Sequence, residues 1–173
     1  TAEAELPLTP SARAAREAWD PLTDDRALRC EPPGMPAMMH NPYPIEFVDH
    51  GDTIVLRLEE WDAERTIHMR ALPAAPAAPV LRGYSVGRWE DERTLVVATS
   101  HVSGPYYDDF GTPQTSAVRI VERFTLNGAG DRLDYQSLTT DPNVFTAPVE
   151  ARTFWEWKPT EALQPYRCAL PEE

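Results

Sequence analysis

The stretch SAVRIVERFTLNGAGDRLDYQSLTT, residues 116–140, gives the clearest strand signal in this chain. Apolar and polar residues alternate on both sides of a five-residue turn, Asn127–Asp131, which contains Gly128 and Gly130. A period of two places alternate side chains on opposite faces of a β-strand, and a short glycine-containing turn joins two strands as a hairpin. The stretch therefore predicts an antiparallel hairpin with one largely apolar face.

Strand-like sequence also precedes and follows this hairpin at short intervals. Six further strands are predicted, over residues 45–50, 53–61, 65–69, 83–90, 94–102 and 149–158. Residues 72–79 (LPAAPAAP) predict a stiff, extended connector. Eight strands suffice for a sheet to close and still leave room for side chains or one small ligand. We therefore expect an all-β, eight-stranded antiparallel up-and-down barrel of the lipocalin-like (calycin-like) kind, with a two-sheet β-sandwich as the alternative.

The two ends of the chain differ in composition from the strands. Thr9 followed by Pro10 is typical of a helix start, and a helix is predicted to continue to Trp19. The proline-rich residues 30–44 predict an irregular covering segment, with His40 and Tyr43 over a mouth of the barrel. We expect a single domain over 1–173, made of this helix and cover (1–43), an antiparallel meander (44–158) and a C-terminal tail (159–173) held by Cys168.

The charge and the motif content exclude several classes of function. Acidic residues number 28 against 16 basic ones, a formal net charge of −12, so we expect no nucleic-acid partner, which would need a basic patch. No apolar run reaches the roughly 18 residues of a membrane helix, so no membrane span is expected. The chain has no zinc-type Cys/His spacing, phosphate-binding loop or nucleophile elbow. We therefore expect neither a metal nor a cofactor.

Cys30 and Cys168 are the two cysteines of the chain, and they lie near opposite ends of the predicted domain. A disulfide between them would clasp the two ends; the alternative is a pair of buried free thiols. The sequence begins with Thr1 rather than Met, which suggests that a leader or another upstream segment was removed. Disulfides persist in oxidising compartments, so a periplasmic or secreted protein is expected.

Four blocks of sequence resemble an abundant family of exported bacterial proteins of uncharacterised activity. The blocks are GYSVGRWEDERTLVV (83–97), GTPQTSAVRIVERF (111–124), TTDPNVFTAPV (139–149) and QPYRC (164–168). Asp91-Glu92-Arg93 stands where members usually have Gly-Asp, so the hairpin turn is longer here. The resemblance covers roughly residues 30–168. It implies an exported, intact domain and brings no catalytic residue with it.

Three ionisable residues are candidates for proton-transfer chemistry. Glu122 lies on the apolar face of its predicted strand, so it is either paired with a neighbouring arginine (Arg119 or Arg123) or a general acid/base with a raised pKa. His101 is predicted at a strand end beside the turn-rich loop that contains Asp108. If the protein is an enzyme, His101 with Glu122 or Asp108 would serve a cofactor-free lyase, hydratase or isomerase.

Aromatic residues are the candidates for ligand binding. The predicted ligand-binding residues are Tyr43, Trp89, Tyr106, Tyr135 and Trp155. Three functions from different classes remain open at this point. The leading one is an exported barrel that binds a small, largely apolar molecule; the others are the cofactor-free enzyme and an accessory subunit that docks on a larger exported assembly through residues 1–43.

Overall fold

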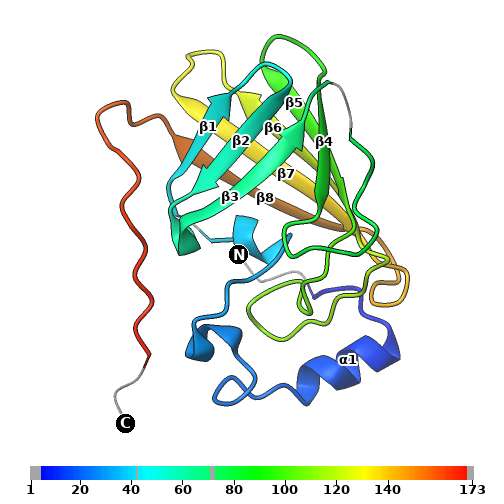
Figure 1. Cartoon of the computed structure of the whole chain (residues 1–173). Helices are drawn as coiled ribbons and strands as arrows, with labels where there is room; N and C mark the ends of the chain where they lie inside the picture. The colour runs from blue at the N-terminus through cyan, green and yellow to red at the C-terminus, as the bar shows by residue number, and fades with distance from the viewer. Residues whose placement is uncertain (1–4, 42, 71–72, 171–173) are drawn as a thin grey trace.

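A computed structural model describes residues 5–41, 43–70 and 73–170 of the chain. Their eight strands form one sheet in chain order, which is curled into a half-barrel (Figure 1). The strands are β1 (Ile45–Asp49), β2 (Thr53–Leu58), β3 (Ala63–His68), β4 (Tyr84–Trp89), β5 (Thr94–Ser100), β6 (Arg119–Leu126), β7 (Arg132–Thr140) and β8 (Val149–Glu156). All eight predicted strands are present in one continuous sheet, rather than in the two sheets of a sandwich.

The sheet is mixed, so the prediction of a purely antiparallel meander is wrong at one junction. Strands β3 and β4 run parallel, with Ile67 opposite Ser85 and His68 opposite Val86, whereas the other neighbouring pairs are antiparallel. The connector between them contains prolines at 73, 76 and 79. A proline-rich chain extends by about 3.1 Å per residue, which is enough to return along the full length of a strand. Tyr84 Oη donates to Pro73 O at 2.7 Å and holds this connector against the sheet.

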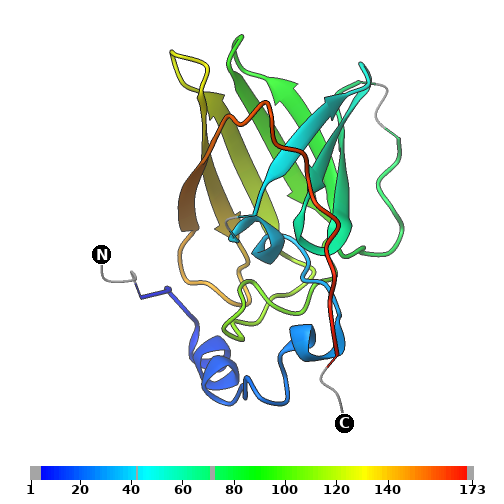
Figure 2. The same cartoon turned by 90° about the vertical axis from the view of Figure 1, so that its left-hand side faces the viewer.

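The half-barrel is open between its first and last strands. Within the described residues the strand order ends at β1 and β8, with no ladder joining them. The single parallel junction makes β1 and β8 run in the same direction, so they do not meet as the antiparallel edges of a closed meander. Trp155 Nε1 donates to Tyr43 O at 2.9 Å across this opening. Figure 2 shows the C-terminal tail crossing the opening between β8 and β1.

The N-terminal segment covers one end of the half-barrel (bottom of Figure 1). Helix α1 (Pro10–Glu17) begins as predicted, because Thr9 Oγ1 accepts from Ala12 N at 3.3 Å. Two short 3₁₀ turns follow, η1 (Arg26–Arg29) and η2 (Ala37–Met39), and a third, η3 (Glu60–Asp62), joins β2 to β3. None of the described helices is long and apolar enough to span a membrane.

Two apolar clusters hold the N-terminal cover, residues 5–41, and the sheet together. The larger one fills the curled face of the sheet and takes in Met35, Met38 and Met39 from the cover. The smaller one joins Leu8 and Ala12 to Tyr107 and Phe145. Burial of side chains of this size stabilises a fold by about 1.5–3 kcal/mol each. The cover is therefore part of the core of this domain.

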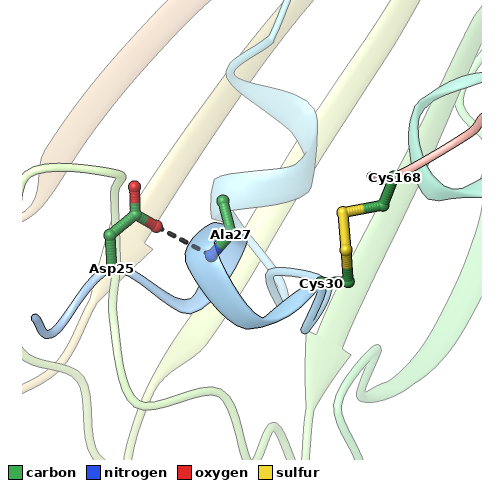
Figure 3. Close-up of a disulfide and its surroundings, with 4 residues drawn as sticks. All are labelled: Asp25, Ala27, Cys30 and Cys168. Atoms are coloured by element: carbon green, nitrogen blue, oxygen red, sulfur yellow. Dashed lines mark hydrogen bonds between the residues drawn. A yellow bond between two sulfur atoms is a disulfide. The ribbon is translucent and has the colours of Figure 1, made fainter. Parts of the chain in front are cut away.

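Cys30 and Cys168 form a disulfide, as predicted (Figure 3). The bond joins positions 138 residues apart, with their Cα atoms 5.8 Å from each other. Cys30 directly follows η1, whose cap is formed by Asp25 Oδ1 accepting from Ala27 N at 2.9 Å (Figure 3). The disulfide thus ties the end of the tail to the covering segment.

Replacing both cysteines with alanine should lower the free energy of unfolding by about 3–5 kcal/mol, because the unfolded chain would lose a cross-link across a very long loop. Urea denaturation of the Cys30→Ala/Cys168→Ala variant, compared with the oxidised wild type, measures this loss. An unchanged midpoint would show that the disulfide does not stabilise this fold.

Candidate functional site

A charged pair lies in the centre of the half-barrel. Arg65 of β3 and Glu122 of β6 are 1% and 0% exposed. Arg65 Nη1 donates to Glu122 Oε1 at 2.9 Å, and Nη2 donates to Oε2. This two-point geometry matches the planar guanidinium to both carboxylate oxygens, the arrangement that best offsets the cost of burying both charges.

Three further side chains complete what we call the interior polar cluster. Arg65 donates from Nε to Ser85 Oγ at 2.9 Å and from Nη2 to Thr99 Oγ1 at 2.6 Å. Tyr135 Oη donates to Glu122 Oε1 at 3.0 Å. Burial, together with the charge of Glu122, raises the pKa of Tyr135 well above its ordinary value, so the phenol keeps its proton. The cluster links five consecutive strands, β3 to β7.

The partner of Glu122 is Arg65, and neither of the two arginines considered from the sequence. Arg123 pairs with Glu90, and Arg119 donates to the backbone carbonyls of Ser116 and Val118, just before β6. The sequence does contain a signal for this pairing. Ala63, Arg65 and Ile67 alternate along one strand, so Arg65 lies on an apolar face, as Glu122 does on its own strand. A buried glutamate and a buried arginine on inward faces are expected to pair.

The structure does not bring His101 and Glu122 together. His101 follows the end of β5 with φ 56° and shares a hydrogen bond of 2.8 Å between its Nδ1 and Ser100 Oγ. Its ring lies 6.4 Å from that of Tyr84, which alternates with the inward-facing Ser85 and is therefore on the outer face of the sheet. Among the described residues, no hydrogen bond joins His101 to Glu122, the first of the two carboxylates considered for it.

Asp108, the other candidate acid, serves the structure of its own loop. Its Oδ1 accepts from Phe110 N and Thr112 N, both at 3.0 Å, and its Oδ2 accepts from Thr112 Oγ1 at 2.7 Å. Three hydrogen bonds of this kind are typical of a carboxylate that shapes a turn.

The five predicted ligand-binding aromatics do not form one cluster. Tyr135 and Trp155 lie together inside the half-barrel, 5.7 Å between ring centroids, whereas Trp89 is 57% exposed. Tyr106 packs edge-on against Trp19, and Tyr43 packs against Tyr166 of the tail. Of the five, Tyr135 alone borders the cavity of about 690 Å³ that lies beside β8.

A cavity of about 690 Å³ lies where the start of β8, the N-terminal segment and the loop after Tyr106 meet. We call it the β8 cavity. Its apolar walls are Leu6, Met39, Tyr107, Phe110, Tyr135 and Ala151. The cavity is also lined by the charged side chains Glu5, Arg16, Asp108, Glu150 and Arg152. Its volume lies within the range of about 300–1,000 Å³ that is common for small-molecule sites.

His40, one of the residues that line this cavity, has a buried polar atom without a partner. It lines the β8 cavity, and its buried Nε2 has no hydrogen-bond partner among the described residues. Its ring packs edge-on against Tyr107 at 5.1 Å. Burial lowers the pKa of His40 below its ordinary 6.5, although the charges of Asp108 and Glu122 act in the opposite direction. The imidazole is therefore neutral at neutral pH, with one ring nitrogen that donates and one that accepts. Burial also raises the pKa of Tyr107 to about 12, so this wall stays uncharged.

No protein-family model and no curated protein matches this chain. Across the described residues there is also no group of three or more His, Cys, Asp or Glu side chains placed to hold a metal ion. The geometry of the site is therefore the basis for assigning a function.

The Arg65–Glu122 pair should show strong energetic coupling. The single variants Arg65→Met and Glu122→Leu should each cost about 3–5 kcal/mol, because each leaves one charge buried without its partner. The double variant should cost less than either single variant, since it leaves neither charge. Urea denaturation of the four proteins measures the coupling, and simple addition of the two single costs would contradict it.

The half-buried His40 should make the fold sensitive to acid. Because its pKa in the folded chain is lowered, the unfolded chain takes up a proton first as the pH falls below about 6.5, and the free energy of unfolding decreases. The wild type should lose more stability than His40→Gln between about pH 7.5 and about pH 5. Equal losses in the two proteins, measured by urea denaturation, would show that His40 is not responsible.

Proposed function

We propose that this chain is an exported half-barrel protein that binds a small, largely apolar molecule in the β8 cavity. The observation that carries the proposal is a cavity of about 690 Å³ whose walls are mainly apolar and which is bordered by His40, with its unpartnered Nε2. Binding sites for small molecules commonly combine an apolar surface with a few polar groups that fix the orientation of the ligand.

The arrangement of the walls suggests the chemical class of the ligand. An apolar or aromatic body would pack against Tyr107 and Tyr135, and one neutral hydrogen-bonding group would face His40. Tyr135 is held in place by its hydrogen bond to Glu122, so this wall is rigid before any ligand arrives. The charged residues at the rim favour a ligand with a polar end that remains near solvent.

The exported location is part of the same proposal. The Cys30–Cys168 disulfide supports it, because such bonds persist mainly in the periplasm, in the secretory pathway and outside the cell. We also propose, from the four sequence blocks quoted above, that the chain is related to the exported bacterial family that it resembles. A periplasmic or secreted binding protein is consistent with both points.

The two other functions have less support. The enzyme hypothesis depends on His101 acting with a carboxylate, whereas the described contacts of its ring are with Ser100 and Tyr84. The accessory-subunit hypothesis needs residues 1–43 to be free to dock on a partner. Residues 5–41 instead pack on their own domain, through Leu8 and the buried methionines of the cover. We therefore favour the binding protein.

Filling the β8 cavity should weaken binding. Ala151 lines the cavity, whereas Ala98 is exposed on β5 and serves as a matched control. The neutral fluorescent probe N-phenyl-1-naphthylamine should bind the wild type and Ala98→Leu alike, and Ala151→Leu at least about tenfold more weakly. Fluorescence titration measures the three affinities.

Two results would contradict the proposal. One is equal binding by Ala151→Leu and the wild type, which would place the probe elsewhere. The other is no binding of the probe to the folded wild type, which would show that the cavity does not accept an apolar molecule of this size.

A further inference from the structure

A second, smaller pocket of about 240 Å³ is lined largely by the N-terminal segment. Its walls come from four parts of the chain: the N-terminal segment between Trp19 and Asn41, the turn η3, the loop Pro105–Asp109 and the tail at Tyr166. Asp108 borders both this pocket and the β8 cavity. We call it the aromatic–acidic pocket, for the two kinds of side chain that line it.

Four aromatic rings line the pocket in two pairs. Trp19 and Tyr106 meet edge-on, with 6.4 Å between their centroids. Trp61 and Tyr166 lie closer, 4.8 Å apart and tilted by 41°. The faces of such rings attract cations, and a cage of several rings is a common way to bind a quaternary ammonium group.

The charges of the pocket also favour a cation. It is lined by the carboxylates Asp25, Glu31, Glu60, Asp108 and Asp109. One arginine accompanies them, Arg26, and it already pairs with Glu31 at 3.3 Å. The pocket therefore has an excess of negative charge even after this pair is counted.

Glu60 is a buried carboxylate of this pocket that has a hydrogen-bond partner and no ion-pair partner among the described residues. It is only 8% exposed, and both of its oxygens accept from Asn41 Nδ2 at 2.9 Å. No cationic group among the described residues forms an ion pair with it. A buried carboxylate is normally paired, because an isolated buried charge is costly. Burial correspondingly raises the pKa of Glu60 and of its neighbour Asp109.

Positive backbone φ angles in η3 and hydrogen bonds between the β2–η3 region and the tail position two of the aromatic walls, Trp61 and Tyr166. Trp61 and Asp62 in η3 both have positive φ, 63° and 45°, which is costly for residues other than glycine. Asp62 Oδ1 accepts from Tyr166 N at 3.1 Å, and Glu59 Oε2 accepts from Gln164 N at 2.7 Å. The disulfide at Cys168, two residues after Tyr166, anchors the tail that brings this ring to the pocket.

From the four rings, the excess of carboxylates and the absence of an ion-pair partner for Glu60 among the described residues, we infer that the aromatic–acidic pocket binds a small organic cation of the quaternary or substituted ammonium class. The cation would lie between the two aromatic pairs, with its charge near Glu60 and Asp109. This site is separate from the proposed apolar site in the β8 cavity, and neither assignment depends on the other.

Isothermal titration calorimetry with choline chloride tests the inference. Choline should bind the wild type, and its neutral carbon analogue 3,3-dimethylbutan-1-ol, which has the same shape without the charge, should bind at least about tenfold more weakly. Equal affinities, or no binding of choline at millimolar concentration, would overturn the assignment.

Two variants locate the site. Glu60→Gln keeps the shape of the side chain and removes its charge, and Tyr166→Leu removes one aromatic face. Each should weaken choline binding at least about tenfold. Glu92→Gln, in the exposed β4–β5 turn, makes the same change in net charge and should leave binding unchanged. Equal weakening by Glu60→Gln and Glu92→Gln would mean that choline responds to net charge only, and would refute a built site.

Discussion

The fold depends on the buried pair of Arg65 and Glu122, because it reinforces the weakest junction of the sheet. The β3–β4 ladder joins two residue pairs, whereas the β1–β2 ladder joins five. Arg65 crosses the β3–β4 junction from the inside, through its hydrogen bonds to Ser85 and Thr99, and reaches Glu122 on β6. A side-chain network thus supplies the cross-strand bonding that a longer ladder would otherwise provide.

The parallel junction also accounts for the places where ligands are proposed to bind. It makes β1 and β8 run in the same direction, and among the described residues no ladder joins these two strands, so the half-barrel is open along one side. The cover and the tail then have to protect the opening and one end of the sheet, and the Cys30–Cys168 disulfide joins them. Irregular segments pack less completely than strands do, and both pockets lie along the contacts of the cover with the rest of the chain.

Local patterns in the sequence predicted the local structure well. The eight strands, the helix start at Thr9 and the disulfide were all predictable, because alternation, capping and cysteine pairing each depend on a few neighbouring residues or on simple counting. The parallel junction was not, because a proline-rich connector permits either strand direction. Pairing Glu122 with Arg65 needs the order of strands in the sheet as well as the alternation within each strand. The importance of His40 and Glu60 depends on unpaired atoms and charges, which become visible only when the whole chain is folded.

The central claim is that the opened half-barrel presents a rigid, mainly apolar cavity with His40 as its polar contact. Mapping of amide chemical shifts by nuclear magnetic resonance during titration with N-phenyl-1-naphthylamine tests it most directly. The account predicts shifts confined to the residues around the β8 cavity, chiefly His40, Tyr107, Tyr135 and Ala151. Shifts centred instead on the exposed aromatic residues Trp89 and Phe154, with His40 unaffected, would contradict it.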